Sequence, residues 1–178
     1  MLVIADSSPL VYLSRVGALD LLATAFGEVV VPATVWAEVV DARPDAPGVS
    51  ALRSATWLRV DRRGLPSTDL GLDPGETAAI LLAEALHADL LLIDERAGRA
   101  LAEERGLVVR GTLGVLVHAR QHGALPALRP VLEVSRPGSF AQLNPTEFYQ
   151  FVSRPIGFRG SDLAGRPPGH WSRHVGYP

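Results

Sequence analysis

Apolar residues in this chain occur either as short continuous runs or at helical spacing. Continuous runs occupy residues 2–5, 29–31 and 90–93, and runs that include one Arg occupy residues 57–60 and 108–110. Runs of this length between turn signals predict strands. The stretches between them have the periodicity of helices of about 8 to 15 residues. Strands that alternate with helices require crossover connections, so the pattern predicts an α/β fold with a short, mainly parallel sheet of about four or five strands, covered on both faces.

Capping residues, proline and glycine mark where these helices begin and end. Ser8 before Pro9 predicts an N-cap followed by the first helical residue. A second helix start is predicted at residues 73–76, where Asp73 is the N-cap, Pro74 is N1 and Glu76 is N3 of a capping box. The predicted helices span residues 9–16, 19–26, 32–40, 74–87, 95–105, 112–122 and 125–134, with a short helix also expected just before the strand at 57–60.

Length and composition divide the chain into a domain and an extension. The chain has 178 residues, and residues 1–135 are expected to form one domain with a full core. From residue 136 onward Gly, Pro, Arg and Ser dominate and the periodicity fades, which predicts a partly disordered extension over residues 136–178. No apolar run approaches the roughly 20 residues of a membrane span, and the first residues lack the charged and apolar regions of a signal peptide. A cytoplasmic protein is therefore expected.

Two absent residue types narrow the chemistry. The chain has no Cys, which excludes disulfides, thiolate metal sites and thiol nucleophiles. It also has no Lys, so all 17 basic residues are Arg, and this excludes Schiff-base chemistry and phosphate loops built around Lys. Because the formal net charge is −2, any binding of phosphate groups must depend on a local patch of arginines.

Two aspartates directly follow predicted strands. Asp6 follows residues 2–5 and Asp94 follows residues 90–93, and ligand chemistry in parallel sheets gathers at the carboxyl ends of strands. Helix capping is the structural alternative for both: for Asp6 that role is better filled by Ser8, whereas Asp94 directly precedes a helix. Two carboxylates at neighbouring strand ends repel each other unless a cation lies between them.

Two glutamates extend this pair to a candidate cluster. Glu38 lies in the helix opened by Pro32, where an exposed place on an amphipathic helix is its simplest role. Glu76 has an equally good structural role in its capping box. Carboxylates from several elements are the hard oxygen ligands that suit Mg²⁺ or Mn²⁺, and such a site can activate water against a phosphodiester. The candidate cluster consists of Asp6, Glu38, Glu76 and Asp94.

Several segments follow one another in a distinctive order. They are Asp6-Ser7-Ser8-Pro9-Leu10, Val30-Val31-Pro32 before the helix of Glu38, Leu72-Asp73-Pro74-Gly75-Glu76 before an Ala-rich helix, Leu91-Leu92-Ile93-Asp94-Glu95-Arg96, and Gly111-Thr112-Leu113-Gly114. This ordered set resembles the PIN-domain proteins, especially their VapC-like branch, over about residues 1–135. Many members have Thr or Ser two residues before the last acid, where this chain has Leu92.

The resemblance implies a three-layer α/β/α fold, dependence on Mg²⁺ or Mn²⁺, and cleavage of single-stranded RNA. The family's acidic positions match four residues of this chain, which are expected to act as metal ligands and catalytic residues: Asp6, Glu38, Glu76 and Asp94. Many members are toxins of toxin–antitoxin pairs and form dimers. An RNA substrate, a cognate antitoxin protein and a homodimer are therefore the expected partners, with no membrane.

The resulting hypothesis is a metal-dependent endoribonuclease. Ser7, Arg96 and Arg99 are its candidate substrate-binding residues, since Arg suits phosphate contacts, although a solvent-exposed helix face is an equally simple role for the two arginines. The arginines of the extension are a further candidate for binding single strands, with disorder as the alternative. A non-catalytic RNA-binding or regulatory module on the same fold and a metal-dependent DNA nuclease remain open. A phosphatase or phosphotransfer receiver normally needs a Lys, which the chain lacks.

Overall fold

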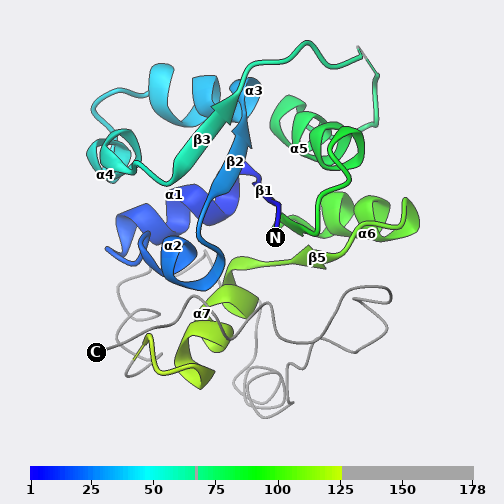
Figure 1. The fold of residues 1–178 in the computed structure, drawn as a ribbon. Coiled ribbons are helices and arrows are strands. Elements are labelled where there is room, and N and C mark those ends of the chain that lie inside the picture. The colour runs from blue at the N-terminus through cyan, green and yellow to red at the C-terminus, as the bar shows by residue number, and fades with distance from the viewer. Residues whose placement is uncertain (67, 126–178) are drawn as a thin grey trace. The chain divides into compact units, whose positions relative to one another are not determined.

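Five parallel strands form the centre of the fold, in the order β3-β2-β1-β4-β5 (Figure 1). The computed structural model describes residues 1–66 and 68–125. The strands are β1 (Val3–Ala5), β2 (Val29–Pro32), β3 (Leu58–Asp61), β4 (Leu90–Leu92) and β5 (Val109–Arg110). Each agrees with a predicted apolar run to within about one residue at either end, so the predicted short parallel sheet is confirmed.

Helices make every crossover between these strands. They are α1 (Ser7–Arg15), α2 (Leu21–Phe26), α3 (Ala33–Trp36), the π-helical turn η1 (Ala37–Asp41), α4 (Val49–Ser54), α5 (Pro74–Ala85), α6 (Arg96–Glu104) and α7 (Thr112–Gln121). Within residues 1–66 and 68–125, no helix is long and apolar enough to cross a membrane. The predicted helix at 125–134 falls almost entirely outside the described residues, and the predicted extension at 136–178 falls wholly outside them.

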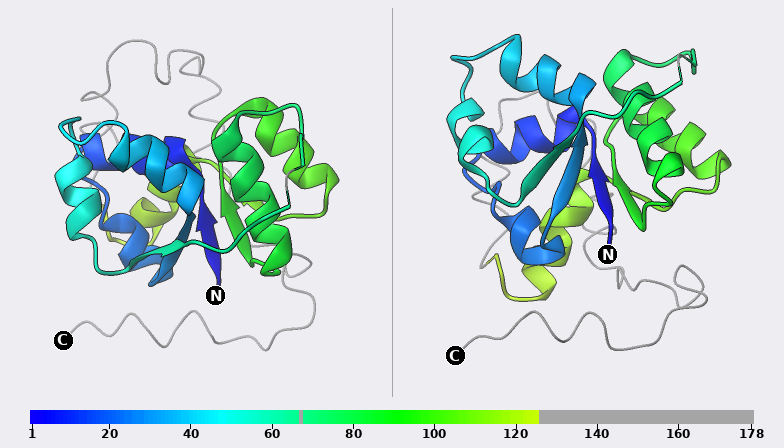
Figure 2. Two further views of the ribbon diagram at one scale, coloured as in Figure 1. Left: turned by 90° about the horizontal axis from the view of Figure 1, so that it is seen from above. Right: turned by 45° about the horizontal axis from the view of Figure 1, so that its top comes forward.

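Two apolar cores, one on each face of the sheet, give the fold its three layers. Successive residues of a strand point to opposite faces. Val3 and Ala5 of β1 accordingly join the larger core, to which α1, α2, α3, η1, α4 and α7 contribute, whereas Ile4 joins the smaller core under α5 and α6. Figure 2 shows α5 and α6 on one side of the sheet and the remaining helices on the other. The predicted covering of both faces is therefore confirmed. Because both faces are apolar, the buried polar side chains of the sheet lie at the strand ends.

The start of α1 differs from the prediction. The helix begins at Ser7, so Asp6 and not Ser8 occupies the N-cap position. Pro9 is therefore the third helical residue instead of the first. The first N–H groups of a helix have no partner inside it, so a proline, which lacks an N–H, is tolerated at either position. The pair Ser8-Pro9 marks the first turn without fixing its first residue.

Candidate active site

Asp6 lies at the carboxyl end of the central strand β1. Its backbone N–H donates to the carbonyl of Leu92, at 2.9 Å, which fixes it beside the end of β4. The residue is only 1% exposed. Although it stands at the N-cap of α1, its side chain makes no capping hydrogen bond, and Oδ1 has no hydrogen-bond partner within the described part of the chain. Local helix capping therefore leaves this buried oxygen unused.

Glu76 faces the same region from the first turn of α5. The predicted cap is confirmed, because Asp73 is the N-cap and its Oδ1 accepts the N–H of Glu76 at 2.7 Å. The Glu76 side chain is directed into the protein and the residue is 4% exposed. Its Oε1 is a second buried oxygen for which the described residues provide no partner. Burying an unpartnered carboxylate is costly, so both atoms point to a missing ligand or to protonation.

Glu38 reaches the cluster from the π-helical turn η1. The N–H of Ala42 donates to the carbonyl of Ala37 at 2.8 Å, which is the wider π spacing, so the predicted single α-helix changes type at this point. Such turns occur often at functional sites. Glu38 Oε2 lies 2.9 Å from the position that a Cβ atom on Gly75 would occupy.

Gly75 marks the centre of the cluster. The same Cβ position lies 3.3 Å from Asp73 Oδ1 and 3.5 Å from Asp6 Oδ1, in addition to Glu38 Oε2. This point is thus surrounded by carboxylate oxygens from the end of β1, from η1 and from the N-cap of α5. It is open because Gly75 has no side chain. Asp6, Glu38 and Asp73 surround Gly75, and Glu76 interacts by charge with Asp6 and Asp73. We call these four carboxylates the carboxylate cradle.

The electrostatics of the cradle follow from burial and from like charges. Burial raises the pKa of Asp6 to about 6, the neighbouring charges of Asp73 and Glu38 add to this, and the nearby backbone N–H groups of Ser7 and Ser8 offset only part of it. Burial likewise raises the pKa of Glu76 to about 7, with further increases from Asp73 and Asp6. The neighbouring negative charges thus make Asp6 and Glu76 harder to ionise, which is the effect that a bound cation reverses.

Asp94 has a different environment from the other three predicted acids. Its Oδ1 accepts the backbone N–H of Thr112 at 2.7 Å, and its Oδ2 accepts the Thr112 hydroxyl at 2.5 Å. The alternative role predicted for it, capping the helix that follows, is wrong, because Glu95 is the N-cap of α6. Asp94 instead joins the end of β4 to the first residue of α7, and its role as a metal ligand stays a prediction.

The predicted substrate-binding residues lie near this edge of the sheet. Ser7 is the half-buried first residue of α1, and Arg96 and Arg99 are exposed on α6. Arg99 Nη1 lies 3.8 Å from the Cβ position of Gly111, and Asp94 Oδ1 lies 2.8 Å from that same position. Arg99 thus extends toward Asp94, while substrate binding by all three residues stays a prediction.

Sequence reasoning missed three contributors to the site. Asp73 was assigned only a capping role, yet its charge acts on Asp6 and Glu76. Gly98, inside α6, leaves room for the Glu76 carboxylate, because a Cβ there would lie 2.6 Å from Glu76 Oε1 and would displace it. Gly75 has the corresponding role in α5. A glycine inside a helical pattern signals close packing in general, but the partner of each one depends on tertiary contacts.

The cradle fits a hard divalent cation in its chemistry. Within residues 1–66 and 68–125, no group of three or more His, Asp or Glu side chains is already arranged to hold a metal ion. The two unpartnered buried oxygens, Asp6 Oδ1 and Glu76 Oε1, nevertheless require compensation. An all-carboxylate set is the donor type that Mg²⁺ and Mn²⁺ prefer. The residues present therefore suit such an ion better than any soft metal.

Comparison with known proteins gives one match. A family model for the PIN domain matches residues 2–140 of the chain. Searches of curated proteins and of solved structures gave no significant match. The matched range includes all the strands and helices described above and every residue of the cradle.

Proposed function

Because the chain belongs to the PIN-domain family, whose members are generally nucleases, we propose that it is an endoribonuclease that depends on Mg²⁺ or Mn²⁺. The observation that carries this proposal is the carboxylate cradle, in which two buried oxygens have no partner among the described residues. Carboxylates so placed repel a nucleic acid unless a cation lies between them and the phosphate. PIN domains typically use divalent metals, which agrees with this chemistry.

Asp6 and Glu76 are the residues proposed to hold the metal, with Asp94 at the neighbouring strand end as a further candidate. When bound, a divalent ion supplies an acidified water and neutralises charge on the scissile phosphodiester. Burial of Asp6 and Glu76 excludes bulk water from their oxygens. Glu38 is exposed, and its Oε2 faces the open point at Gly75. Glu38 is therefore the carboxylate that we propose accepts a proton from the attacking water.

Replacing Asp6 tests the proposal most directly. The Asp6→Asn variant keeps the size of the side chain but removes a ligand charge, so Mn²⁺-dependent cleavage of a single-stranded RNA should fall by at least about 100-fold. Asp45→Asn, in the exposed loop before α4, is the matched control and should cleave like the unmodified protein. Cleavage by Asp6→Asn at the unmodified rate would refute the assignment. Single-stranded DNA of the same sequence, run in parallel, distinguishes a ribonuclease from a DNA nuclease.

We further propose that the protein is the toxin of a toxin–antitoxin pair and acts as a homodimer. The support for this is the similarity of the segments around Asp6, Glu76 and Asp94 to the VapC-like branch. Induced expression in a bacterial host should arrest growth, and Asp6→Asn should not. Size-exclusion chromatography with light scattering should give about twice the 19.0 kDa chain mass. Normal growth on induction would contradict the toxin role, and a monomeric mass would contradict the dimer.

A further inference from the structure

Helix α5, which carries Gly75 and Glu76 of the carboxylate cradle, also forms one wall of a pocket. The pocket has a volume of about 420 Å³ and is bounded by the ends of β2 and β3, the start of α3, residues between 63 and 66 and between 68 and 72, and the first turns of α5. Pro74 lines the pocket and is bonded to Gly75, the centre of the cradle. The pocket and the cradle are therefore adjacent through the first turn of α5, which contributes residues to both. Its volume is in the range of sites for small ligands.

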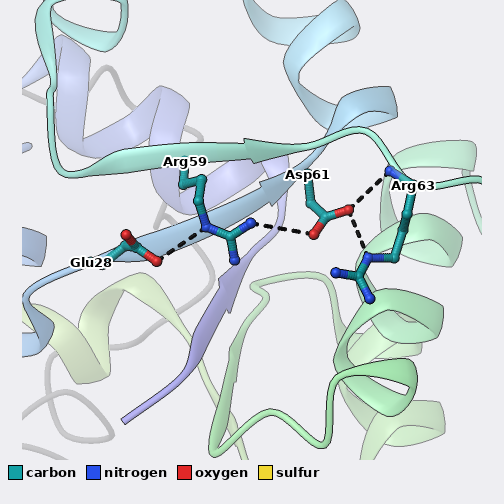
Figure 3. A network of polar contacts seen from close by, with 4 residues as sticks. All are labelled: Glu28, Arg59, Asp61 and Arg63. Carbon is teal, nitrogen blue, oxygen red and sulfur yellow. Dashed lines mark hydrogen bonds and ion pairs between the residues drawn. The ribbon is translucent and has the colours of Figure 1, made fainter.

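Arg63 contributes a charged group of fixed orientation to this pocket (Figure 3). Its Nε donates to Asp61 Oδ1 at 2.8 Å, and its backbone N–H donates to the same oxygen at 3.0 Å. Asp61 is 7% exposed, and the hydrogen bond from Arg63 holds the pKa of its carboxyl below the ordinary value. The guanidinium is thus held at one edge by a buried, ionised carboxylate.

The remaining donors of Arg63 are available to a ligand. Nη1 and Nη2 make no hydrogen bond within the part of the chain that the structure describes, and the side chain is about half exposed. The other arginine on Asp61 is Arg59, whose Nη1 lies 3.4 Å from Asp61 Oδ2 and whose Nε is bound by Glu28 at 3.1 Å. Arg59 does not line the pocket. Two free N–H groups in one plane are the arrangement that binds a phosphate bidentately.

The walls of the pocket suit a flat, partly polar group. Leu65, Leu72 and Leu81 provide apolar surface. Thr34 and Thr77 add hydroxyl groups that can donate or accept. A nucleobase has this combination of apolar faces and a hydrogen-bonding edge.

We propose that this pocket binds the base of one unpaired nucleotide next to the scissile phosphodiester, with Arg63 on that nucleotide's phosphate. The inference rests on the proposed nuclease function and names the substrate feature that the site selects. A base must leave its stack to enter a pocket of this size, which is possible in a single strand and costly in a duplex. The pocket thereby selects single-stranded RNA over double-stranded RNA.

The first test measures the affinity of a fluorescent single-stranded RNA of about 12 nucleotides in EDTA, so that binding is separated from cleavage. Arg63→Gln should weaken binding about tenfold. The slope of the logarithm of the binding constant against the logarithm of the salt concentration should become shallower by about 1, the value for one lost phosphate contact. Arg59→Gln is the matched control, because it removes the other ion pair of Asp61 but leaves the pocket intact. Its affinity should stay within about twofold of the unmodified protein. Equal losses in the two variants, or no loss in Arg63→Gln, would overturn the proposal.

The second test fills the pocket without changing any charge. Thr77→Phe places a ring in the pocket from α5 and should also weaken binding of single-stranded RNA about tenfold, with an unchanged melting temperature. Thr24→Phe, an exposed position on α2, is the control and should bind normally. Unchanged affinity of Thr77→Phe would overturn the proposal. Binding of a duplex with the same dependence on Arg63 and Thr77 would overturn it as well.

Cleavage in Mn²⁺ separates the failure of this inference from the failure of the proposed function. One outcome is that Arg63→Gln and Thr77→Phe lose affinity for RNA but the unmodified protein does not cleave it. The pocket is then supported and the catalytic proposal fails. If the unmodified protein cleaves and both variants cleave with its KM, the pocket is refuted and the catalytic proposal stands.

Discussion

At the scale of single residues, the unusual feature is that Asp6 and Glu76 are buried next to other acids. Each has one oxygen without a hydrogen-bond partner among the described residues. The helix N-terminus beside each carboxylate gives only partial compensation. The protein therefore bears a cost in stability at this site, which agrees with a site that is completed by a ligand.

The pH dependence of stability should reveal this cost. Burial raises the pKa of Asp6 to about 6 and of Glu76 to about 7, so the folded chain holds both protons at pH values where the unfolded chain has released them. The stabilisation is complete below the ordinary pKa values of 3.8 and 4.5 and is lost as the pH rises through the raised ones. In EDTA, the Tm should decrease by roughly 3 to 8 °C between about pH 4.5 and pH 8.

Two variants test which carboxyl group causes this decrease of Tm with pH, which thermal melting measures. Glu76→Gln cannot ionise, so its Tm should change less with pH than that of the unmodified protein. Glu103→Gln, at an exposed position on α6, should keep the full slope. An identical slope in Glu76→Gln would show that this carboxyl does not cause it.

Gly75→Ala should separate stability from function. Alanine normally favours a helix over glycine by about 1 kcal/mol, so the Tm should be equal or slightly higher. Its Cβ, however, would lie 2.9 Å from Glu38 Oε2, which displaces the carboxylate. RNA cleavage in Mn²⁺ should therefore fall by roughly tenfold or more. Gly64→Ala, where no atom lies within 4 Å of the added group, should leave cleavage unchanged, and equal activity of the two variants would contradict the cradle.

At the scale of secondary-structure elements, Asp94 acts as a link between strand and helix. It accepts both the backbone N–H and the hydroxyl of Thr112, which is 0% exposed. The negative charge also lies at the N-terminus of α7, where the helix dipole favours it. Asp94 therefore stabilises the docking of α7 on the sheet, whatever further part it takes in the active site.

Asparagine substitutions should distinguish Asp94 from Asp6. Asp94→Asn retains only one acceptor for the two donors of Thr112, so unfolding should become easier by about 1 to 3 kcal/mol. Asp6→Asn removes a buried charge that repels its neighbours, so stability should be unchanged or higher. Denaturation in urea without divalent ions measures both. A loss in Asp6→Asn as large as in Asp94→Asn would contradict this division of roles.

At the scale of the whole molecule, the cradle is assembled from distant parts of the chain. Asp6 follows β1, Glu38 lies in η1 after β2, and Glu76 lies in α5 after β3. These elements meet because β1 is central in the sheet, with β2 on one side and β4 on the other, and because α3 packs against α5. Binding of one ion by these residues would thus couple several elements at once.

Titration with Mn²⁺ should stabilise the folded protein as a whole. An ion that binds only the folded state raises stability by mass action, by about 2.7 kcal/mol at a concentration 100 times its Kd. For a chain of this length that corresponds to an increase in Tm of roughly 5 to 10 °C. The increase should vanish in Asp6→Asn and persist in Asp45→Asn. An equal increase in both variants would place the ion elsewhere.

The local pattern of the sequence determined the strands, most helices and the capping by Asp73. The three central strands, β1, β2 and β4, are recognisable because a parallel strand buried on both faces is a continuous apolar run. Asp73 is recognisable as an N-cap because its bond to the Glu76 N–H spans only three residues. The positions of Asp6 and Asp94 at strand ends follow from the same local pattern. The matching of Glu38 and Glu76 to the site depended on the family resemblance.

Only the tertiary structure decided what these residues touch. The partner of Asp94 is Thr112, 18 residues away, whereas the local pattern offered only capping of the adjacent helix as its structural role. The closeness of Asp73 to Asp6 depends on contacts between separate elements, and so does the room that Gly75 and Gly98 leave for carboxylates. The π-helical turn at Glu38 was likewise not visible in the local pattern. Hydrophobic periodicity records which face of an element is buried. It does not record which other element lies against that face, and that neighbour determines both the pKa of a carboxylate and its ligand.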